Sequence, residues 1–159
     1  MSIDFPVTWE EIHRVSKTLA ASLKDKGPFK GIVAVTRGGM IPACLLAREL
    51  DIRTIETVSY SSYDHQKQTE GKVTKEAFAA GDGEGWLVVD DLADTGNTFR
   101  GLRKILPKGH FACFYVKPEG KDTADTYAAE VPQDHWIFLP WEDQDFPPHI
   151  MEQIGKHLK

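Results

Sequence analysis

Residues 86–99 read WLVVDDLADTGNTF, in which an apolar run ends in two adjacent aspartates and a third aspartate opens a stretch of small polar residues. The run WLVVD (86–90) is continuous and apolar, which is typical of a strand buried on both faces. Apolar residues at helical spacing then follow from Phe99 to Leu106. We therefore expect a strand that ends at the acids, a turn that contains a glycine, and a helix.

Strands and helices alternate along the rest of the chain. Thr8 and Glu11 form a capping box at the start of a helix that apolar residues extend to Leu23. Further elements are expected as strands at 31–36, 54–60, 72–78 and 111–116, and as helices at 42–50 and 150–158. Continuous apolar strands between helices predict an α/β fold, with a mainly parallel twisted sheet covered by helices on both faces.

Length and composition favour one cytoplasmic domain. The 159 residues, 41% of them hydrophobic, suit a single core, and no apolar run reaches the roughly 20 residues of a membrane span. Cys44 and Cys113 lie in apolar segments without CxxC spacing, so we expect both in the core. The histidines show no metal-ligand spacing, and the net charge of −5 argues against nucleic acid as a partner.

The acids and the turn suit a phosphorylated sugar. Adjacent carboxylates at Asp90 and Asp91 accept hydrogen bonds from a vicinal diol or from the water shell of Mg²⁺. The segment DTGNT (94–98) offers free backbone N–H groups and two hydroxyls at a helix start, where phosphate binds. An acidic cap at an ordinary turn is the simpler interpretation. A receiver domain is a further one, but in receivers the acid pair follows the first strand, and here three strands precede Asp90.

Six segments together resemble the type I purine phosphoribosyltransferases, and among them the bacterial enzymes that act on xanthine and guanine. The run VVDDLADTGNT (88–98) is similar to the motif with which that family binds phosphoribosyl pyrophosphate (PRPP). The other segments are VTRGG (35–39), SSYDH (61–65), GDGEG (81–85), KPEG (117–120) and PQDHWIFLPWED (132–143). The resemblance covers essentially the whole chain.

The resemblance implies a purine salvage enzyme. Such an enzyme transfers the 5-phosphoribosyl group of PRPP to N9 of guanine or xanthine, and of hypoxanthine more weakly, which gives GMP, XMP or IMP plus pyrophosphate. It further implies Mg²⁺ as cofactor, a homotetramer, and at most peripheral attachment to the inner membrane. The single domain, residues 1–159, would carry a flexible loop at about 61–85 and a hood largely from 130–159. A PRPP-sensing regulator without catalysis is the alternative.

The resemblance also assigns the site residues. Those implied for PRPP are Arg37, Gly38, Asp90, Asp91, Thr95, Gly96, Asn97 and Thr98, with Asp91 also engaging Mg²⁺. Those implied for the purine are Asp94, as contact to N7 and general base, Lys117 at O6, Trp136 stacked on the base, and Ile137 at the 2-position. Family members often hold a non-proline cis peptide in the TRGG turn. This chain departs from the pattern at Thr69, where an arginine is familiar, and at Glu142, where an aspartate is.

Overall fold

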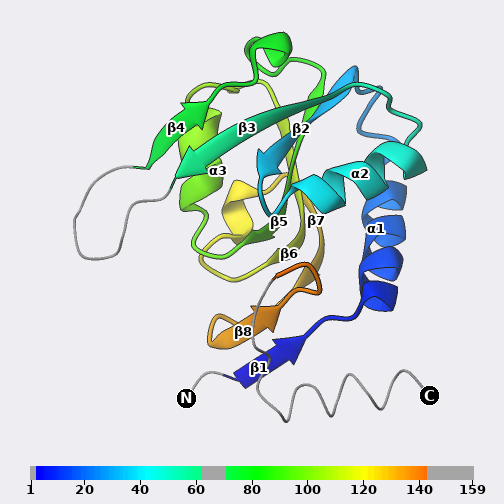
Figure 1. Cartoon of the computed structure of the whole chain (residues 1–159), viewed down its shortest axis with the longest axis vertical. Coiled ribbons are helices and arrows are strands. Elements are labelled where there is room, and N and C mark those ends of the chain that lie inside the picture. The colour runs from blue at the N-terminus through cyan, green and yellow to red at the C-terminus, as the bar shows by residue number, and fades with distance from the viewer. Residues whose placement is uncertain (1–2, 62–70, 143–159) are drawn as a thin grey trace.

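A six-stranded sheet forms the centre of the protein in this computed structural model, which describes residues 3–61 and 71–142 (Figure 1). The strand order is β4-β3-β2-β5-β6-β7, and all neighbours pair in parallel except β4, which is antiparallel to β3. The strands are β2 (Gly31–Thr36), β3 (Ile55–Ser61), β4 (Lys72–Lys75), β5 (Trp86–Ala93), β6 (His110–Val116) and β7 (Thr126–Glu130). The expected α/β fold with a mainly parallel sheet is confirmed.

Helices cover both faces of this sheet. On one face lie α1 (Trp9–Leu23) and α2 (Met40–Glu49), and on the other lies α3 (Asn97–Arg103) (Figure 1). The predicted start of α1 is confirmed, since Thr8 Oγ1 accepts a hydrogen bond from the Glu11 N–H at 3.2 Å. The second half of the expected capping box is not formed, because the Glu11 carboxylate pairs with Arg14 instead of turning back to the helix start.

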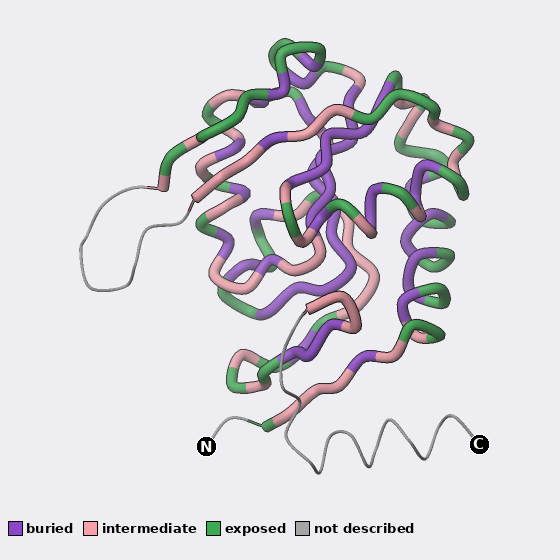
Figure 2. Tube along the Cα trace, viewed as in Figure 1, coloured by how far each residue is buried: buried purple, intermediate pink, exposed green. Residues whose placement is uncertain are grey.

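Side chains of the central strands alternate between two apolar cores. In β2, Ile32 and Ala34 belong to the core under α1 and α2, whereas Val33 and Val35 belong to the core under α3. Buried residues accordingly run along the middle strands in Figure 2. A strand buried on both faces has no polar side, which is why its sequence is a continuous apolar run.

A second, two-stranded sheet pairs the two ends of the described chain. β1 (Ile3–Pro6) lies parallel to β8 (His135–Phe138), below the large sheet in Figure 1. The sequence pattern predicted neither strand, and it also missed β7. Two 3₁₀ turns, η1 (Phe78–Ala80) and η2 (Lys121–Thr123), complete the elements. The helix expected at 150–158 lies outside the described residues.

The prediction that both cysteines are buried holds for only one of them. Cys113 is buried in β6, whereas Cys44 is exposed on α2, and both are free thiols. In α2 the buried residues are Pro42, Ala43, Leu46 and Ala47, so the helical period turns position 44 outward. Within the described residues no helix is long and apolar enough to cross a membrane.

Candidate functional site

The candidate site lies where the direction of the sheet reverses. From β2 the chain continues to β3 on one side, whereas β5, the other neighbour of β2, continues to β6 on the opposite side. In parallel sheets of this kind, ligands bind beyond the carboxyl ends of the two strands at the reversal. Here those ends carry Arg37 and Gly38 after β2, and Asp90 and Asp91 in β5.

The turn after β2 packs directly against the acids. A Cβ at Gly38 would overlap the carboxylate of Asp91, so only glycine allows this approach. The Gly39 N–H closes the turn by donating to the Val35 carbonyl at 2.8 Å. The expected non-proline cis peptide is present between Thr36 and Arg37. Arg37 itself is exposed, beside the space in front of the two strands.

Two adjacent carboxylates lie in β5, where Asp90 is buried and Asp91 is half-buried. The strand was expected to end at Asp90, but its pairing with β6 continues to Ala93, so both acids lie within the sheet. The Asp91 N–H donates to Asp90 Oδ1 at 2.9 Å, and the Leu92 N–H donates to Asp91 Oδ1 at 2.7 Å. Within the described residues, neither carboxylate pairs with a lysine or arginine.

Burial therefore governs the ionisation of this pair. Loss of hydration raises the pKa of Asp90 well above its ordinary value, and the neighbouring charge of Asp91 raises it further. Loss of hydration also raises the pKa of Asp91, although its hydrogen bonds act in the opposite direction. A site with two carboxylates that lack a basic partner suits a ligand that brings hydroxyl donors or a cation.

The third acid, Asp94, is held between two further strand ends. Lys117, which follows β6, donates from Nζ to Asp94 Oδ2 at 2.9 Å. Gln133, which follows β7, donates from Nε2 to Asp94 Oδ1 at 2.8 Å. Lys117 is only 4% exposed, whereas the Asp94 side chain is 45% exposed and open to a ligand. The carboxyl ends of β5, β6 and β7 thus deliver one polar side chain each to a single point.

This arrangement sets an acceptor beside a donor. The carboxylate of Asp94 accepts hydrogen bonds, and the ammonium of Lys117 offers only donors. A planar ligand that carries an N–H next to a carbonyl oxygen would match the two groups in turn.

The turn before α3 can bind an anion through its backbone. Gly96 has a φ of 84°, and a Cβ there would overlap Thr123 of η2. Among the described residues, the N–H groups of Thr95, Gly96 and Thr98 have no hydrogen-bond acceptor, and the Asn97 N–H has only a long bond to Thr95 Oγ1 at 3.4 Å. Because α3 has seven residues, the N–H groups contribute more than its dipole does.

Arg100 holds this turn in place. Its Nη1 donates to the Thr95 carbonyl at 2.8 Å, and its Nη2 donates to the Glu119 carbonyl at 3.3 Å. These bonds join the turn before α3 to the segment that follows Lys117. The anion-binding turn and the Asp94–Lys117 pair are therefore fixed relative to each other.

The two residues expected at the base from the C-terminal segment lie in β8. Trp136 is 54% exposed, and within the described chain its ring stacks on no other aromatic side chain and receives no cation. Ile137 is buried in the core under α1 and α2. The structure connects this sheet to Asp94 through Gln133, a residue that the sequence analysis missed.

Glu142 lies close enough to the acid pair for the charge of Asp91 to act on it. Burial raises its pKa, and the nearby charge of Asp91 adds to the rise. Its Oε2 accepts from the Leu139 N–H at 3.4 Å. Thr69, the other position where the sequence departs from the family pattern, lies outside the described residues.

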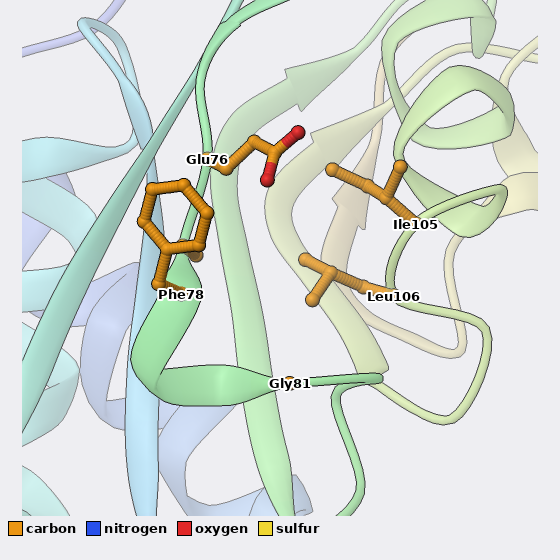
Figure 3. Close-up of a pocket in the computed structure, with 6 residues that line it drawn as sticks. Glu76, Phe78, Gly81, Ile105 and Leu106 are labelled. Atoms are coloured by element: carbon orange, nitrogen blue, oxygen red, sulfur yellow. The ribbon is translucent and has the colours of Figure 1, made fainter.

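A separate hollow lies at the opposite end of β5. It has a volume of about 150 Å³ and is lined by Glu76, Ala77, Phe78, Gly81, Ile105 and Leu106. Figure 3 shows Glu76 and Phe78 on one side of the space, with Ile105 and Leu106 facing them. The lining offers one charged group and no converging polar atoms. This hollow therefore lacks the carboxylates and hydrogen-bond donors of the candidate site at the carboxyl ends of β2 and β5.

Comparisons with known proteins agree with the geometry. Residues 8–145 match the family described as Phosphoribosyl transferase domain. The chain is 53% identical over 141 residues to the xanthine-guanine phosphoribosyltransferase of Nitratidesulfovibrio vulgaris, covering 88% of this chain and 85% of that one. It is 52% identical over 154 residues to the enzyme of the same name from Gluconobacter oxydans, covering 94% and 92%.

Among solved structures, the fold is similar to a purine phosphoribosyltransferase from Pyrococcus horikoshii. The TM-score is 0.75 at 28% sequence identity, and the match covers 91% of this chain and 97% of that one.

We predict that Asp90→Asn stabilises the fold at neutral pH. The substitution keeps the shape and removes a buried charge that has a charged neighbour, so the free energy of unfolding should rise by about 1 kcal/mol. Chemical denaturation measures this change. In acid the gain should shrink, because the cost that a raised pKa imposes falls as the unfolded chain also becomes protonated, and it is absent below the ordinary pKa of aspartate.

Asp82→Asn is the matched control. Asp82 is exposed and pairs with Lys108 at 2.9 Å, and that pairing lowers its pKa, so its loss should bring no gain. An Asp90→Asn variant that is less stable than the wild type at neutral pH would contradict the reading of Asp90 as a costly buried charge.

Proposed function

Because the chain belongs to the phosphoribosyl transferase family, we propose that it is a purine salvage enzyme that uses PRPP to ribosylate guanine and xanthine. It transfers the 5-phosphoribosyl group to N9 of the base and releases pyrophosphate, with hypoxanthine as a weaker acceptor. Curated relatives that are about half identical over most of the chain carry the name xanthine-guanine phosphoribosyltransferase.

The pairing of Asp94 with Lys117 carries the proposal. A PRPP site alone would fit any member of the family, whereas this pair recognises the acceptor. Lys117 donates to O6 of an oxopurine, and Asp94 accepts from N7–H. Adenine presents an amine at the same position, so two donors would face each other there.

The acids and the two turns bind PRPP. Asp90 and Asp91 accept hydrogen bonds from the ribose hydroxyls, and the backbone of residues 95–98 binds the 5′-phosphate together with the threonine hydroxyls. Gly38 lies against Asp91, and with Arg37 it is assigned to the pyrophosphate. Each of these roles is the one that the resemblance to the family implies.

In the reaction, the N9 lone pair of the base attacks C1′ of PRPP. The bond from C1′ to the pyrophosphate oxygen breaks, and its electron pair leaves with pyrophosphate. The proton on N7 passes to Asp94, so that the nucleotide leaves neutral at the imidazole ring. Hydrogen bonds to the ribose and to the leaving group strengthen as positive charge develops at C1′, which lowers the barrier.

The donor set fits Mg²⁺, which phosphoribosyltransferases generally use with PRPP. Mg²⁺ usually takes one or two carboxylates from the protein and the rest of its ligands from phosphates and water. Asp91 suits that role because its half-buried carboxylate has no lysine or arginine partner among the described residues, which also contain no cluster of three His, Cys, Asp or Glu that would hold a metal alone. When bound, the ion supplies positive charge to the leaving pyrophosphate.

We further propose that Trp136 stacks on the bound purine. Its ring is more than half exposed, and it lies three residues beyond Gln133, which contacts Asp94. The backbone of Ile137 would then meet the 2-position. A homo-oligomer, a tetramer by the resemblance, working in the cytoplasm completes the proposal.

We predict that purified protein with PRPP and Mg²⁺ converts guanine and xanthine to their nucleotides. Hypoxanthine should react more slowly and adenine should not react, because Lys117 has no acceptor on the adenine amine. One spectrophotometric assay compares the four bases. No turnover of any oxopurine would overturn the proposed function.

We predict that Asp94→Asn lowers kcat by about 10²-fold or more, because an amide cannot take the N7 proton. Steady-state kinetics with saturating guanine and PRPP measure the change. Thermal unfolding of the variant controls for a loss of structure. Unchanged kcat would remove Asp94 from proton transfer.

We predict that Gly38→Ala weakens the use of PRPP more than the use of guanine. The new methyl group would displace the Asp91 carboxylate, so kcat/KM for PRPP should fall by about 10²-fold. The apparent KM for guanine, whose contacts lie at Asp94 and Lys117, should change little. An equal weakening of the apparent KM for PRPP and for guanine would show that the turn does not act on PRPP alone.

A further inference from the structure

We propose that Gln133 is a positioning residue for the proposed reaction: its side-chain amide orients the Asp94 carboxylate toward the purine. The inference rests on the proposed function. It extends that function to a residue to which the resemblance gives no role. Gln133 Nε2 donates to Asp94 Oδ1 at 2.8 Å, and Lys117 Nζ donates to Asp94 Oδ2 at 2.9 Å. Each carboxylate oxygen therefore has one protein donor.

The orientation of the amide is fixed by its other contact. Gln133 Oε1 accepts a hydrogen bond from the Glu119 N–H at 3.1 Å. A flipped amide would place its oxygen against the carboxylate of Asp94 and its NH₂ group against a backbone N–H. Both bonds would then be lost, so the chemistry of the two neighbours selects one orientation.

The backbone delivers Gln133 to this place from both sides. On one side, the Val131 N–H donates to the Val116 carbonyl at 2.9 Å, which extends the ladder between β6 and β7. On the other side, the His135 N–H donates to the Pro132 carbonyl at 3.1 Å and closes the turn. These two bonds fix the backbone on either side of Gln133. The hydrogen bonds to Asp94 and Glu119 then restrict its side chain.

The consequence concerns the direction of the Asp94 carboxylate. Without Gln133, Asp94 would keep one of these two bonds, to Lys117 Nζ, and its carboxylate could rotate about Cβ–Cγ. With two donors from two strands, the remaining lone pairs of Asp94 point to the open side, where its side chain is 45% exposed. A base that must accept the N7 proton at a defined place gains rate from such fixed geometry.

Two variants at the same position test the inference. Gln133→Met keeps the length of the side chain and removes the donor, whereas Gln133→Glu keeps an acceptor for Glu119 but turns a charged oxygen toward Asp94. We expect kcat/KM for guanine to fall about 10-fold to 10²-fold in Gln133→Met, and further in Gln133→Glu. The apparent KM for PRPP should stay within about 2-fold in both, since PRPP contacts other residues.

A merely structural role predicts the opposite order. If Gln133 only closed its turn through the Glu119 N–H, then Gln133→Glu would be close to the wild type and Gln133→Met would be the weaker enzyme. Asp134→Asn is the matched control, because Asp134 lies in the same turn, is 67% exposed and pairs only with His135 among the described residues. It should leave all constants unchanged.

The outcomes separate the two proposals. An active wild type in which Gln133→Glu outperforms Gln133→Met, or in which neither variant differs from the wild type, overturns the role of Gln133 alone. A wild type without turnover of any oxopurine overturns the proposed function and this inference with it. Loss of kcat/KM for guanine in the order wild type, Met, Glu, with a steady KM for PRPP, supports the inference.

Discussion

The parallel pairing of β2 with β5 is the interaction on which both the fold and the site depend. The register pairs Ala34 with Val89, and each residue belongs to the core under α1 and α2. A slip of one residue would exchange the two apolar cores, so packing on both faces fixes this register. At the carboxyl end the same register places Gly39 against the Val89 carbonyl and Gly38 against Asp91. The pairing of the two strands therefore also sets the positions of the site residues that follow the last apolar pair.

The acid pair shows how binding capacity opposes stability. Asp90 is 9% exposed, and within the described chain it accepts a bond from its neighbour's N–H without a basic partner. A buried carboxylate beside a half-buried one destabilises the folded state at neutral pH, and a ligand with hydroxyl groups or a cation would offset that cost. The apolar residues Val88 and Val89, buried just before the pair, stabilise the strand that carries it.

The sequence predicted the elements whose signals are local. β2 was expected at 31–36 and is found there, because a strand covered on both faces is a continuous apolar run. β7 and β8 were missed, since TYAAE and HWIF are short and owe their conformation to pairing with β6 and β1. Cys44 was misplaced because an apolar run inside a helix has an exposed side that composition does not reveal.

The candidate site divides in the same way. The groups proposed for PRPP come from one stretch around β5 and from the glycine turn, so their spacing in the sequence already indicates a sugar phosphate. Two groups proposed for the purine, Asp94 and Lys117, and the residue that holds Asp94, Gln133, come from three separate segments, which meet only because β5, β6 and β7 are neighbours. A lone glutamine after a proline carries no signal of its own.

This division has a physical consequence for specificity. The part of the site proposed for PRPP is built from backbone and adjacent carboxylates, whose places the register of β2 and β5 fixes. The part proposed for the purine is built from side chains at the ends of three strands, and Gln133 joins it to the two-stranded sheet that holds Trp136. Small changes in the turn between β7 and β8 would therefore move both the acid proposed to take the proton and the ring proposed to stack.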